Sequence, residues 1–194
     1  MRPRSTVLAA LVTSIGLGLA GCGQQPPVTS HARQEGLATV SPSAADPASA
    51  WAEGYCGAVG GLVRTMATLP SVDPSTPEQA SRTSSQLMAS VADGLRRTSA
   101  ALGTIGPSPV AGGDASRTAA VAQLDGIRSR ADDVRHRLDS STDSETTKTA
   151  LRDARTSLDE LDRLDLLRGL NDVPQLATAS SRIPVCQDLV KQPR

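Results

Sequence analysis

Large aromatic side chains are almost absent from this chain of 194 residues, which contains no Phe, one Trp (Trp51) and one Tyr (Tyr55). A core without aromatic rings must be built from Leu, Val, Ala, Ile and Met. These smaller side chains let helices approach closely and leave little room for a deep cavity. The same shortage disfavours a sugar-binding platform, which stacks its ligand on aromatic faces. The composition therefore predicts a narrow, solid fold.

An excess of basic charge is also missing, since 20 Lys and Arg residues face 20 Asp and Glu residues. Nucleic-acid phosphates are neutralised by Lys and Arg. The balanced composition therefore disfavours nucleic acid as a partner, and electrostatic docking on anionic lipid with it.

Histidine is equally scarce. His31 lies far from the helical segments, and His136, between Arg135 and Arg137, falls off the apolar face of its segment. No Ser, His and Asp are singled out as a catalytic set. The acidic residues lack the inward-facing Glu and His pattern of metal sites in helical bundles. We therefore predict a protein that is not an enzyme and that holds no metal or cofactor.

The chain has no apolar run of ordinary membrane-spanning length. The apolar segment near the N-terminus, Val7 to Ala20, has about 14 residues and no charge, whereas a transmembrane helix needs roughly 20. Arg2 and Arg4 precede this run, and a short basic segment followed by an apolar one of this size is typical of an export signal.

The apolar run ends in Leu19-Ala20-Gly21-Cys22, which resembles the lipobox of bacterial lipoproteins. The resemblance implies that the export machinery recognises Leu19, Ala20 and Gly21, cleaves after residue 21 and leaves a diacylglyceryl group on Cys22. Residues 1–21 would then be a signal peptide, and two acyl chains would anchor the protein to the extracytoplasmic face of the cell membrane. The alternative is an ordinary secretory signal followed by an accidental cysteine.

Only three cysteines are present, so a lipidated Cys22 leaves Cys56 and Cys186 as an even pair. Exported proteins with such a pair commonly oxidise it. A disulfide closing a loop of about 130 residues would stabilise the fold by roughly 4–5 kcal/mol. Two free thiols or a two-cysteine metal site are the alternatives, and no His lies near either cysteine in the sequence.

Residues 22–45 lack hydrophobic periodicity and are rich in Gln, Pro, Ser, Thr, Ala and Gly. This composition is typical of a disordered linker. A flexible chain of this length spans roughly 25–30 Å. The sequence therefore predicts a lipidated tether that holds the following domain away from the membrane.

Residues 46–194 contain four helical periods separated by capping and stop signals. The expected helices run from Asp46 to the residue before Pro70, from Thr76 to Gly106, from Asp114 to about Leu138 and from Thr142 to Gly169, with a short helical turn from Pro174 to about Ser181. No segment has the pattern of a strand. We therefore predict an all-α domain, an antiparallel four-helix bundle with a short C-terminal helical turn.

Each expected helix has one apolar face. These faces comprise Trp51, Tyr55, Val59, Leu62, Met66 and Leu69; Leu87, Met88, Val91, Leu95, Leu102 and Ile105, with Thr98 in the gap; Val121, Leu124, Ile127, Ala131, Val134 and Leu138; and Leu151, Ala154, Leu158, Leu161, Leu164 and Leu167. Charged residues occupy the rest of the third and fourth helices, and we interpret them as a solvated outer face.

The first helix carries four glycines, Gly54, Gly57, Gly60 and Gly61. Each interior glycine costs about 1 kcal/mol relative to Ala, so the cluster needs a reason. We interpret it as close packing of a neighbouring helix or of the C-terminal tail. The alternative is a ligand groove beside Trp51 and Tyr55, lined by the backbone of Gly57 and Gly61.

Several stretches resemble a group of uncharacterised actinobacterial lipoproteins. They are the lipobox, Trp51-Ala52-Glu53-Gly54-Tyr55-Cys56, the turn from Leu102 to Val110 with Gly112-Gly113-Asp114, and Pro184-Val185-Cys186-Gln187. The resemblance implies a surface-anchored envelope protein and assigns no activity. We expect a monomeric, non-enzymatic binding or scaffolding module that presents a charged helical face to an envelope protein or the wall. The alternative is a carrier of a small apolar ligand or lipid.

Overall fold

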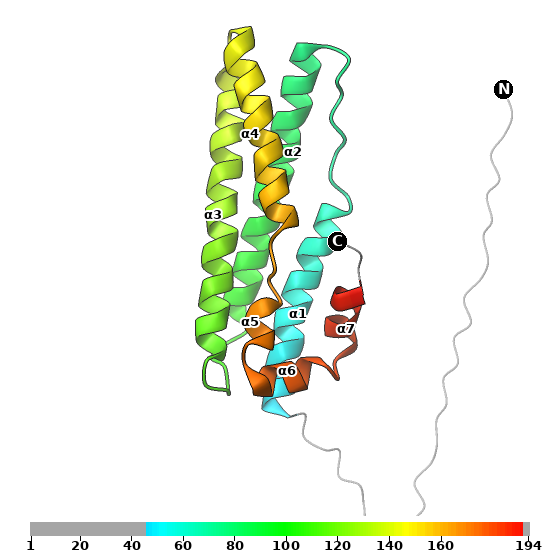
Figure 1. Ribbon diagram of the computed structural model, residues 1–194, viewed down its shortest axis with the longest axis vertical. Coiled ribbons are helices and arrows are strands. Elements are labelled where there is room, and N and C mark those ends of the chain that lie inside the picture. The colour runs from blue at the N-terminus through cyan, green and yellow to red at the C-terminus, as the bar shows by residue number, and fades with distance from the viewer. Residues whose placement is uncertain (1–45, 192–194) are drawn as a thin grey trace, which may run out of the picture. The chain divides into compact units, whose positions relative to one another are not determined.

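Four long helices that alternate in direction form the framework of the protein (Figure 1). The computed structural model describes residues 46–191. The helices are α1 (Pro47–Met66), α2 (Pro77–Thr104), α3 (Gly113–Ser140), α4 (Ser144–Asp162), α5 (Arg168–Asn171), α6 (Pro174–Ser180) and α7 (Pro184–Lys191). No strand occurs in this range. The predicted all-α antiparallel bundle is confirmed, and α5 and α7 are additional to the prediction.

Asp46 and Thr76 cap their helices as predicted, whereas the fourth helix is capped by Asp143 instead of the expected Thr142. The side chains of Asp46, Thr76 and Asp143 each accept a hydrogen bond from the backbone N–H three residues further on, at 3.3, 3.2 and 2.9 Å. These bonds satisfy N–H groups that have no partner within the helix. The bond from the Thr146 backbone also lowers the pKa of Asp143.

The third helix begins before the residue predicted to cap it, so Asp114 is not its N-cap. Gly112 takes that position with a left-handed φ of 88°, and a Cβ on Gly113 would lie 2.1 Å from the Ser108 hydroxyl oxygen. Only glycine permits this backbone conformation and this approach. Asp114 instead accepts a hydrogen bond from the Ser108 N–H at 3.1 Å and thereby fixes the α2–α3 loop.

The long helices do not all run side by side. Helices α2 and α3 extend along the whole described domain, α4 packs on them in the upper half of Figure 1, and α1 packs on α2 in the lower half. Helices α6 and α7 pack on α1, and α5 packs on α3 and α6. The C-terminal ends of α1 and α4 therefore both lie near mid-height in Figure 1, and neither helix packs over the end of the other.

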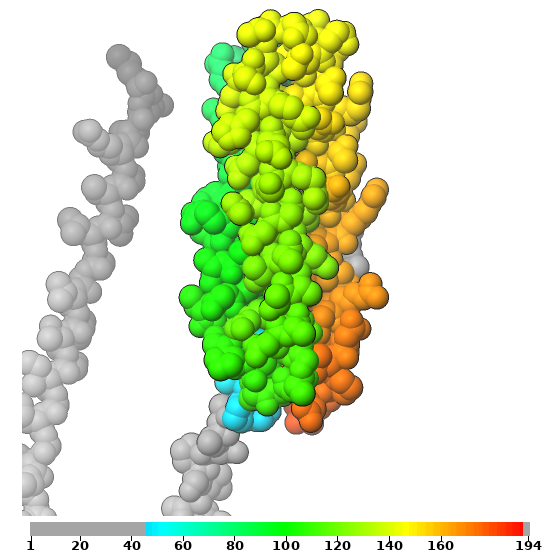
Figure 2. All heavy atoms as spheres, turned by 90° about the vertical axis from the view of Figure 1, so that its left-hand side faces the viewer, coloured from blue at the N-terminus to red at the C-terminus, as the bar shows by residue number. Residues whose placement is uncertain are grey.

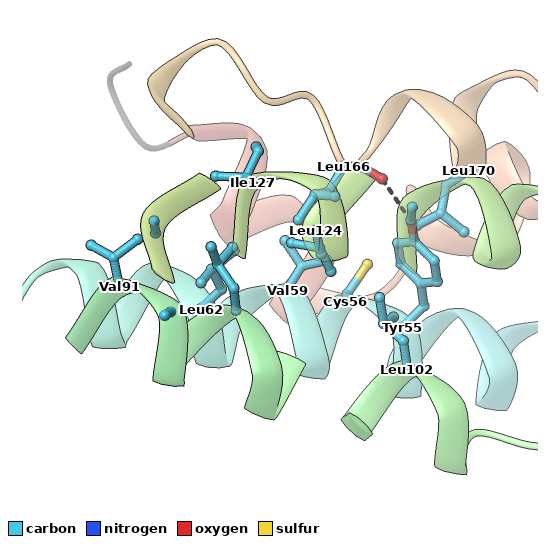
Figure 3. Packing of buried hydrophobic residues seen from close by; sticks show 14 of the residues in the cluster. Tyr55, Cys56, Val59, Leu62, Val91, Leu102, Leu124, Ile127, Leu166 and Leu170 are labelled. Carbon is cyan, nitrogen blue, oxygen red and sulfur yellow. Dashed lines mark hydrogen bonds between the residues drawn. The ribbon is translucent and has the colours of Figure 1, made fainter. Parts of the chain in front are cut away.

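The core consists mainly of the apolar faces of the first three helices (Figure 3). Fully buried side chains include Tyr55, Met88, Val91, Leu95 and Leu124. Thr98, expected within the face of α2, is also buried, and its hydroxyl donates to the Gly94 carbonyl oxygen at 3.0 Å. The predicted faces of these three helices are thus the buried ones, apart from half-buried residues at their ends.

The fourth helix differs from the prediction in its length and in its buried face. It ends at Asp162 instead of Gly169, and its buried residues are Ala150, Ala154 and Ser157. The predicted leucine face is only half-buried along its length. Small side chains let α4 approach its neighbours closely, and the leucines then stand at the edge of the contact.

The break after α4 coincides with one local and one long-range hydrogen bond, made by Asp165 and Leu166. The Asp165 carboxylate accepts a hydrogen bond from the Arg168 N–H at 3.1 Å, in the manner of a helix cap. The Leu166 carbonyl oxygen accepts one from the Tyr55 hydroxyl at 2.8 Å. Side-chain bonds of this kind compete with continuation of the helix. Gly169, predicted to stop the helix, lies within α5.

Two glycines of α2 give a matched test of this packing. A Cβ on Gly94 would lie 2.9 Å from Thr65 Cγ2 and 3.0 Å from Met66 Cε, whereas a Cβ on Gly103 would meet nothing within 4 Å. We expect Gly94→Ala to destabilise the fold by about 1–3 kcal/mol through overpacking. Gly103→Ala should stabilise it by about 0.5–1 kcal/mol. Thermal unfolding of both variants checks this, and equal effects would contradict the α1–α2 contact.

Candidate binding groove beside the disulfide

The residues predicted to carry the anchor are not part of the described structure. Leu19, Ala20, Gly21 and Cys22, the signal peptide at 1–21 and the tether at 22–45 all lie outside residues 46–191. Within the described residues, no helix is both long enough and apolar enough to span a membrane. The geometry below concerns the helical domain alone.

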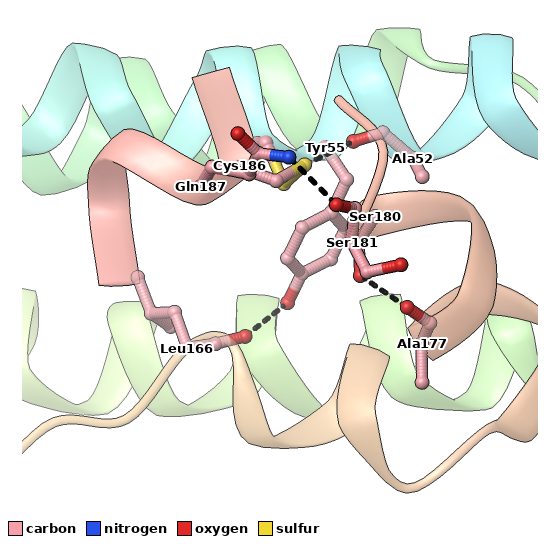
Figure 4. Close-up of a disulfide and its surroundings, with 9 residues drawn as sticks. Ala52, Tyr55, Leu166, Ala177, Ser180, Ser181, Cys186 and Gln187 are labelled. Atoms are coloured by element: carbon pink, nitrogen blue, oxygen red, sulfur yellow. Dashed lines mark hydrogen bonds between the residues drawn. A yellow bond between two sulfur atoms is a disulfide. The ribbon is translucent and has the colours of Figure 1, made fainter. Parts of the chain in front are cut away.

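Cys56 and Cys186 form a disulfide that joins α1 to α7 (Figure 4). Their Cα atoms are 5.2 Å apart and their side chains are buried. The bond links residues 130 positions apart. The predicted pair therefore exists as a disulfide, and the alternatives of free thiols and a metal site do not apply to it.

Helix α7 also packs on a glycine of α1 and is hydrogen-bonded to the end of α6. A Cβ on Gly60 would lie 3.8 Å from Val185 and 3.9 Å from Leu189, which places both side chains over this glycine. The Gln187 side-chain N–H donates to the Ser181 carbonyl oxygen at 2.7 Å. The predicted packing of the C-terminal tail on a glycine of the first helix is thus present at Gly60.

The two aromatic residues belong to the core, which corrects their placement in a ligand groove. Trp51 is 4% exposed and Tyr55 is 0% exposed, with ring centroids 5.6 Å apart. The Trp51 indole N–H donates to the Gly106 carbonyl oxygen at 3.3 Å, and the Tyr55 hydroxyl is bonded to Leu166. Both polar groups are satisfied inside the protein, so neither ring presents a free surface.

Gly57 and Gly61 do not form the backbone-lined groove that was the alternative for the first helix. A Cβ on Gly57 would meet nothing within 4 Å, and one on Gly61 would meet only the Arg64 side chain. Neither glycine lines the pockets described below. The close packing on this helix occurs at Gly54, beside Ile105, and at Gly60.

The buried Tyr55 gives the fold a pH dependence that can be measured. Burial, with a smaller effect of the Asp165 carboxylate, raises the pKa of Tyr55 from 10.0 to about 12. The folded state then binds the phenolic proton more tightly than the unfolded state. This contribution to stability is complete below pH 10 and is lost as the pH rises from 10 to 12.

We expect Tyr55→Phe to cost about 1–2 kcal/mol at neutral pH, because the Leu166 carbonyl oxygen loses its donor. The deficit should shrink above pH 10, where only the wild-type protein loses the tyrosine contribution. Urea denaturation of both proteins from pH 8 to 11 checks this, and a constant difference would contradict the raised pKa. Tyr55 is the only tyrosine, so tyrosinate absorbance reports on it alone.

An apolar pocket of about 340 Å³ opens beside the disulfide. Its walls come from α5, α6 and α7, with Cys56 of α1 at its base, and include Leu167, Leu170, Ala177, Cys186 and Val190. Val190 is 72% exposed, the largest value for a large hydrophobic side chain among the described residues. It stands at the wall of the pocket, where an occupant would cover it.

A second apolar pocket, of about 460 Å³, adjoins the first, because Leu167, Asn171 and Val190 line both. It lies where α4 and α1 end, and its other walls include Val59, Leu62, Met66, Leu161, Leu164 and Leu189. We call the two pockets together the α7 groove. The half-buried leucines that follow the end of α4 line much of it.

The sequence did not identify this groove, although one signal for it was present. Five leucines occur between Leu161 and Leu170. Three of them, Leu161, Leu164 and Leu167, are only half-buried. A leucine density beyond what one helix face requires could have indicated a surface open to an apolar partner.

On the outer face of α3 and α4, many charged side chains form ion pairs with one another. Arg130 lies 2.7 Å from Glu160, and Arg137 lies 2.8 Å from Asp153, across the two helices. Figure 2 shows this face, along which α3 runs from end to end. These partly exposed pairs contribute little to stability, but they leave fewer unpaired charges for a partner.

Among residues 46–191, no three His, Cys, Asp or Glu side chains come together as a possible metal site. His136 is exposed on α3. Comparison of the chain with protein-family models, curated proteins and solved structures finds no match.

Proposed function

We propose that this protein is a membrane-anchored extracytoplasmic lipoprotein and that its helical domain is a non-enzymatic binding module of the cell envelope. The leader with its terminal Leu19-Ala20-Gly21-Cys22 supports the anchor. The disulfide between Cys56 and Cys186 supports an oxidising compartment, because such bonds rarely persist in the cytosol.

The observation that carries a binding role is the α7 groove. It combines two adjoining apolar pockets with the exposed side chain of Val190. An exposed apolar surface rimmed by polar residues is characteristic of an interaction site. The charged face of α3 and α4, which the sequence favoured for this role, is the weaker candidate because many of its side chains pair with one another.

A second candidate, a carrier of a small apolar ligand, is favoured by the size of the pockets. Volumes of about 340 and 460 Å³ lie within the range of ligand pockets, roughly 300–1,000 Å³. Both pockets are lined mainly by apolar side chains. The two candidates share one site and differ in whether a protein or a small molecule occupies it.

The test is purification of the full-length protein from native membranes, with mass spectrometry of the proteins and lipids that accompany it. Val190→Asp should remove the specific companion, because it places a charge in the groove wall. Val72→Asp is the matched control, since Val72 is also exposed, at 39%, and lies in the α1–α2 loop. Equal recovery from all three proteins, or no companion at all, would contradict the proposal.

A further inference from the structure

Three polar side chains of the first pocket, those of Ser180, Ser181 and Gln187, already donate hydrogen bonds within the protein. The Gln187 amide donates to the Ser181 carbonyl oxygen, and the hydroxyls of Ser180 and Ser181 donate to the carbonyl oxygens of residues 177 and 178, at 3.1 and 2.9 Å. An extended peptide would bring backbone N–H and C=O groups that need new partners. A hydrocarbon chain brings none, so it fits this lining better.

The two pockets adjoin, because Leu167, Asn171 and Val190 line both of them. Leu167 and Val190 stand where the pockets adjoin, and Leu164, Leu189 and Met66 line the way beyond them. Each CH₂ group buried there adds to the affinity. Covering Val190, now 72% exposed, adds apolar area on the protein side.

The charges at the two ends of the groove differ in sign. Lys191 lines the first pocket, and its ammonium lies 3.6 Å from the Asp188 carboxylate, with both side chains 71% exposed. An exposed pair of this kind is weak, so the ammonium can turn towards a ligand. Asp162 and Asp165 line the second pocket. Lys191 is the one cationic side chain in the two linings, so an anionic head group fits the first end better than the second.

We propose that the α7 groove binds one acyl chain of an anionic amphiphile, with the head group beside Lys191 and the chain extending past Val190 towards Leu164. This inference rests on the proposed function and specifies the ligand of the same site. A free fatty acid and an acidic lipid share the required chemistry. The groove recognises the acyl chain, and Lys191 recognises the negative charge.

The experiment uses washed native membranes that contain the full-length protein. A fatty acid carrying a diazirine and an alkyne is added directly and irradiated, and the labelled peptides are mapped by mass spectrometry. We expect light-dependent labelling within residues 161–171 and 184–191, weakened about tenfold by Val190→Asp, which corresponds to about 1.4 kcal/mol. Val72→Asp should leave the labelling unchanged.

Two further arms separate the possible occupants. A fatty amine of the same length should label these peptides less than the acid, and Lys191→Glu should reverse that order. Competition by an unlabelled fatty acid or by an acidic phospholipid distinguishes the two sources of the chain. Labelling by the acid that Val190→Asp leaves unchanged would overturn the inference. A protein that co-purifies with the wild type but not with Val190→Asp, together with no labelling of the groove by the acid, would support the binding module and overturn the acyl ligand.

Discussion

Replacing Cys56 and Cys186 together with alanine is expected to lower the free energy of unfolding by about 5 kcal/mol. Without the disulfide, the unfolded chain regains the conformational entropy that closing a loop of this size removes. The disulfide joins residues 130 positions apart and holds α7 on α1. Since small domains are stable by only about 5–15 kcal/mol, this loss is a large fraction of the total. Guanidinium denaturation of the oxidised wild type and the variant measures it.

The wild-type protein under reducing conditions is the control, and it should unfold at the same denaturant concentration as the variant. The packing of α7 should weaken most, because α1 is its main contact and the disulfide is its covalent link there. Hydrogen exchange should therefore accelerate first in residues 184–191. A variant as stable as the oxidised wild type would contradict the role given to the disulfide.

Replacing Cys22 with alanine is expected to abolish incorporation of fatty acid into the protein. The thiol of Cys22 is the proposed attachment point, and one acyl chain alone anchors a protein only marginally, whereas two anchor it stably. Metabolic labelling with an alkyne-tagged fatty acid, followed by intact-mass measurement, detects the change. The Cys56→Ala and Cys186→Ala double variant is the control and should keep its label. Label that persists in Cys22→Ala would contradict the lipobox.

The sequence predicted those parts of the fold that depend on local patterns. The caps at Asp46 and Thr76 and the apolar faces of α1 to α3 follow from hydrogen bonds and spacings within a few residues. The cap of α4 was predicted one residue too early, at Thr142 instead of Asp143. The disulfide followed from counting the cysteines of a chain with a predicted export signal. These features need little knowledge of which elements become neighbours in space.

The end of α4 could not be predicted in the same way, because it depends on a distant residue. The hydroxyl of Tyr55 bonds the carbonyl oxygen of Leu166, which lies 111 positions further along the chain. The buried face of α4 depends equally on which side chains let it approach α3. Leucines are the more hydrophobic choice, but Ala150 and Ala154 permit the closer contact.

The α7 groove results from these differences between the predicted and the observed helices. Helix α4 ends at Asp162, so Leu164 and Leu167 lie beyond it and line the groove. The opposite wall is formed by α7, a helix that the sequence did not predict. The alternative ligand groove beside Trp51 and Tyr55 is absent because those rings complete the core, as the apolar face of the first helix predicts. The lining of a site between elements depends on tertiary packing, which periodicity in one segment does not specify.

The most direct test of the α7 groove as the binding surface is site-specific photocrosslinking in intact cells. A benzophenone amino acid is placed at position 190 in one protein and at position 72 in another, both within the full-length chain. The account predicts one dominant adduct, a lipid or a protein, from position 190 and none of the same kind from position 72. Identical adducts from both positions, or no adduct from position 190, would contradict it.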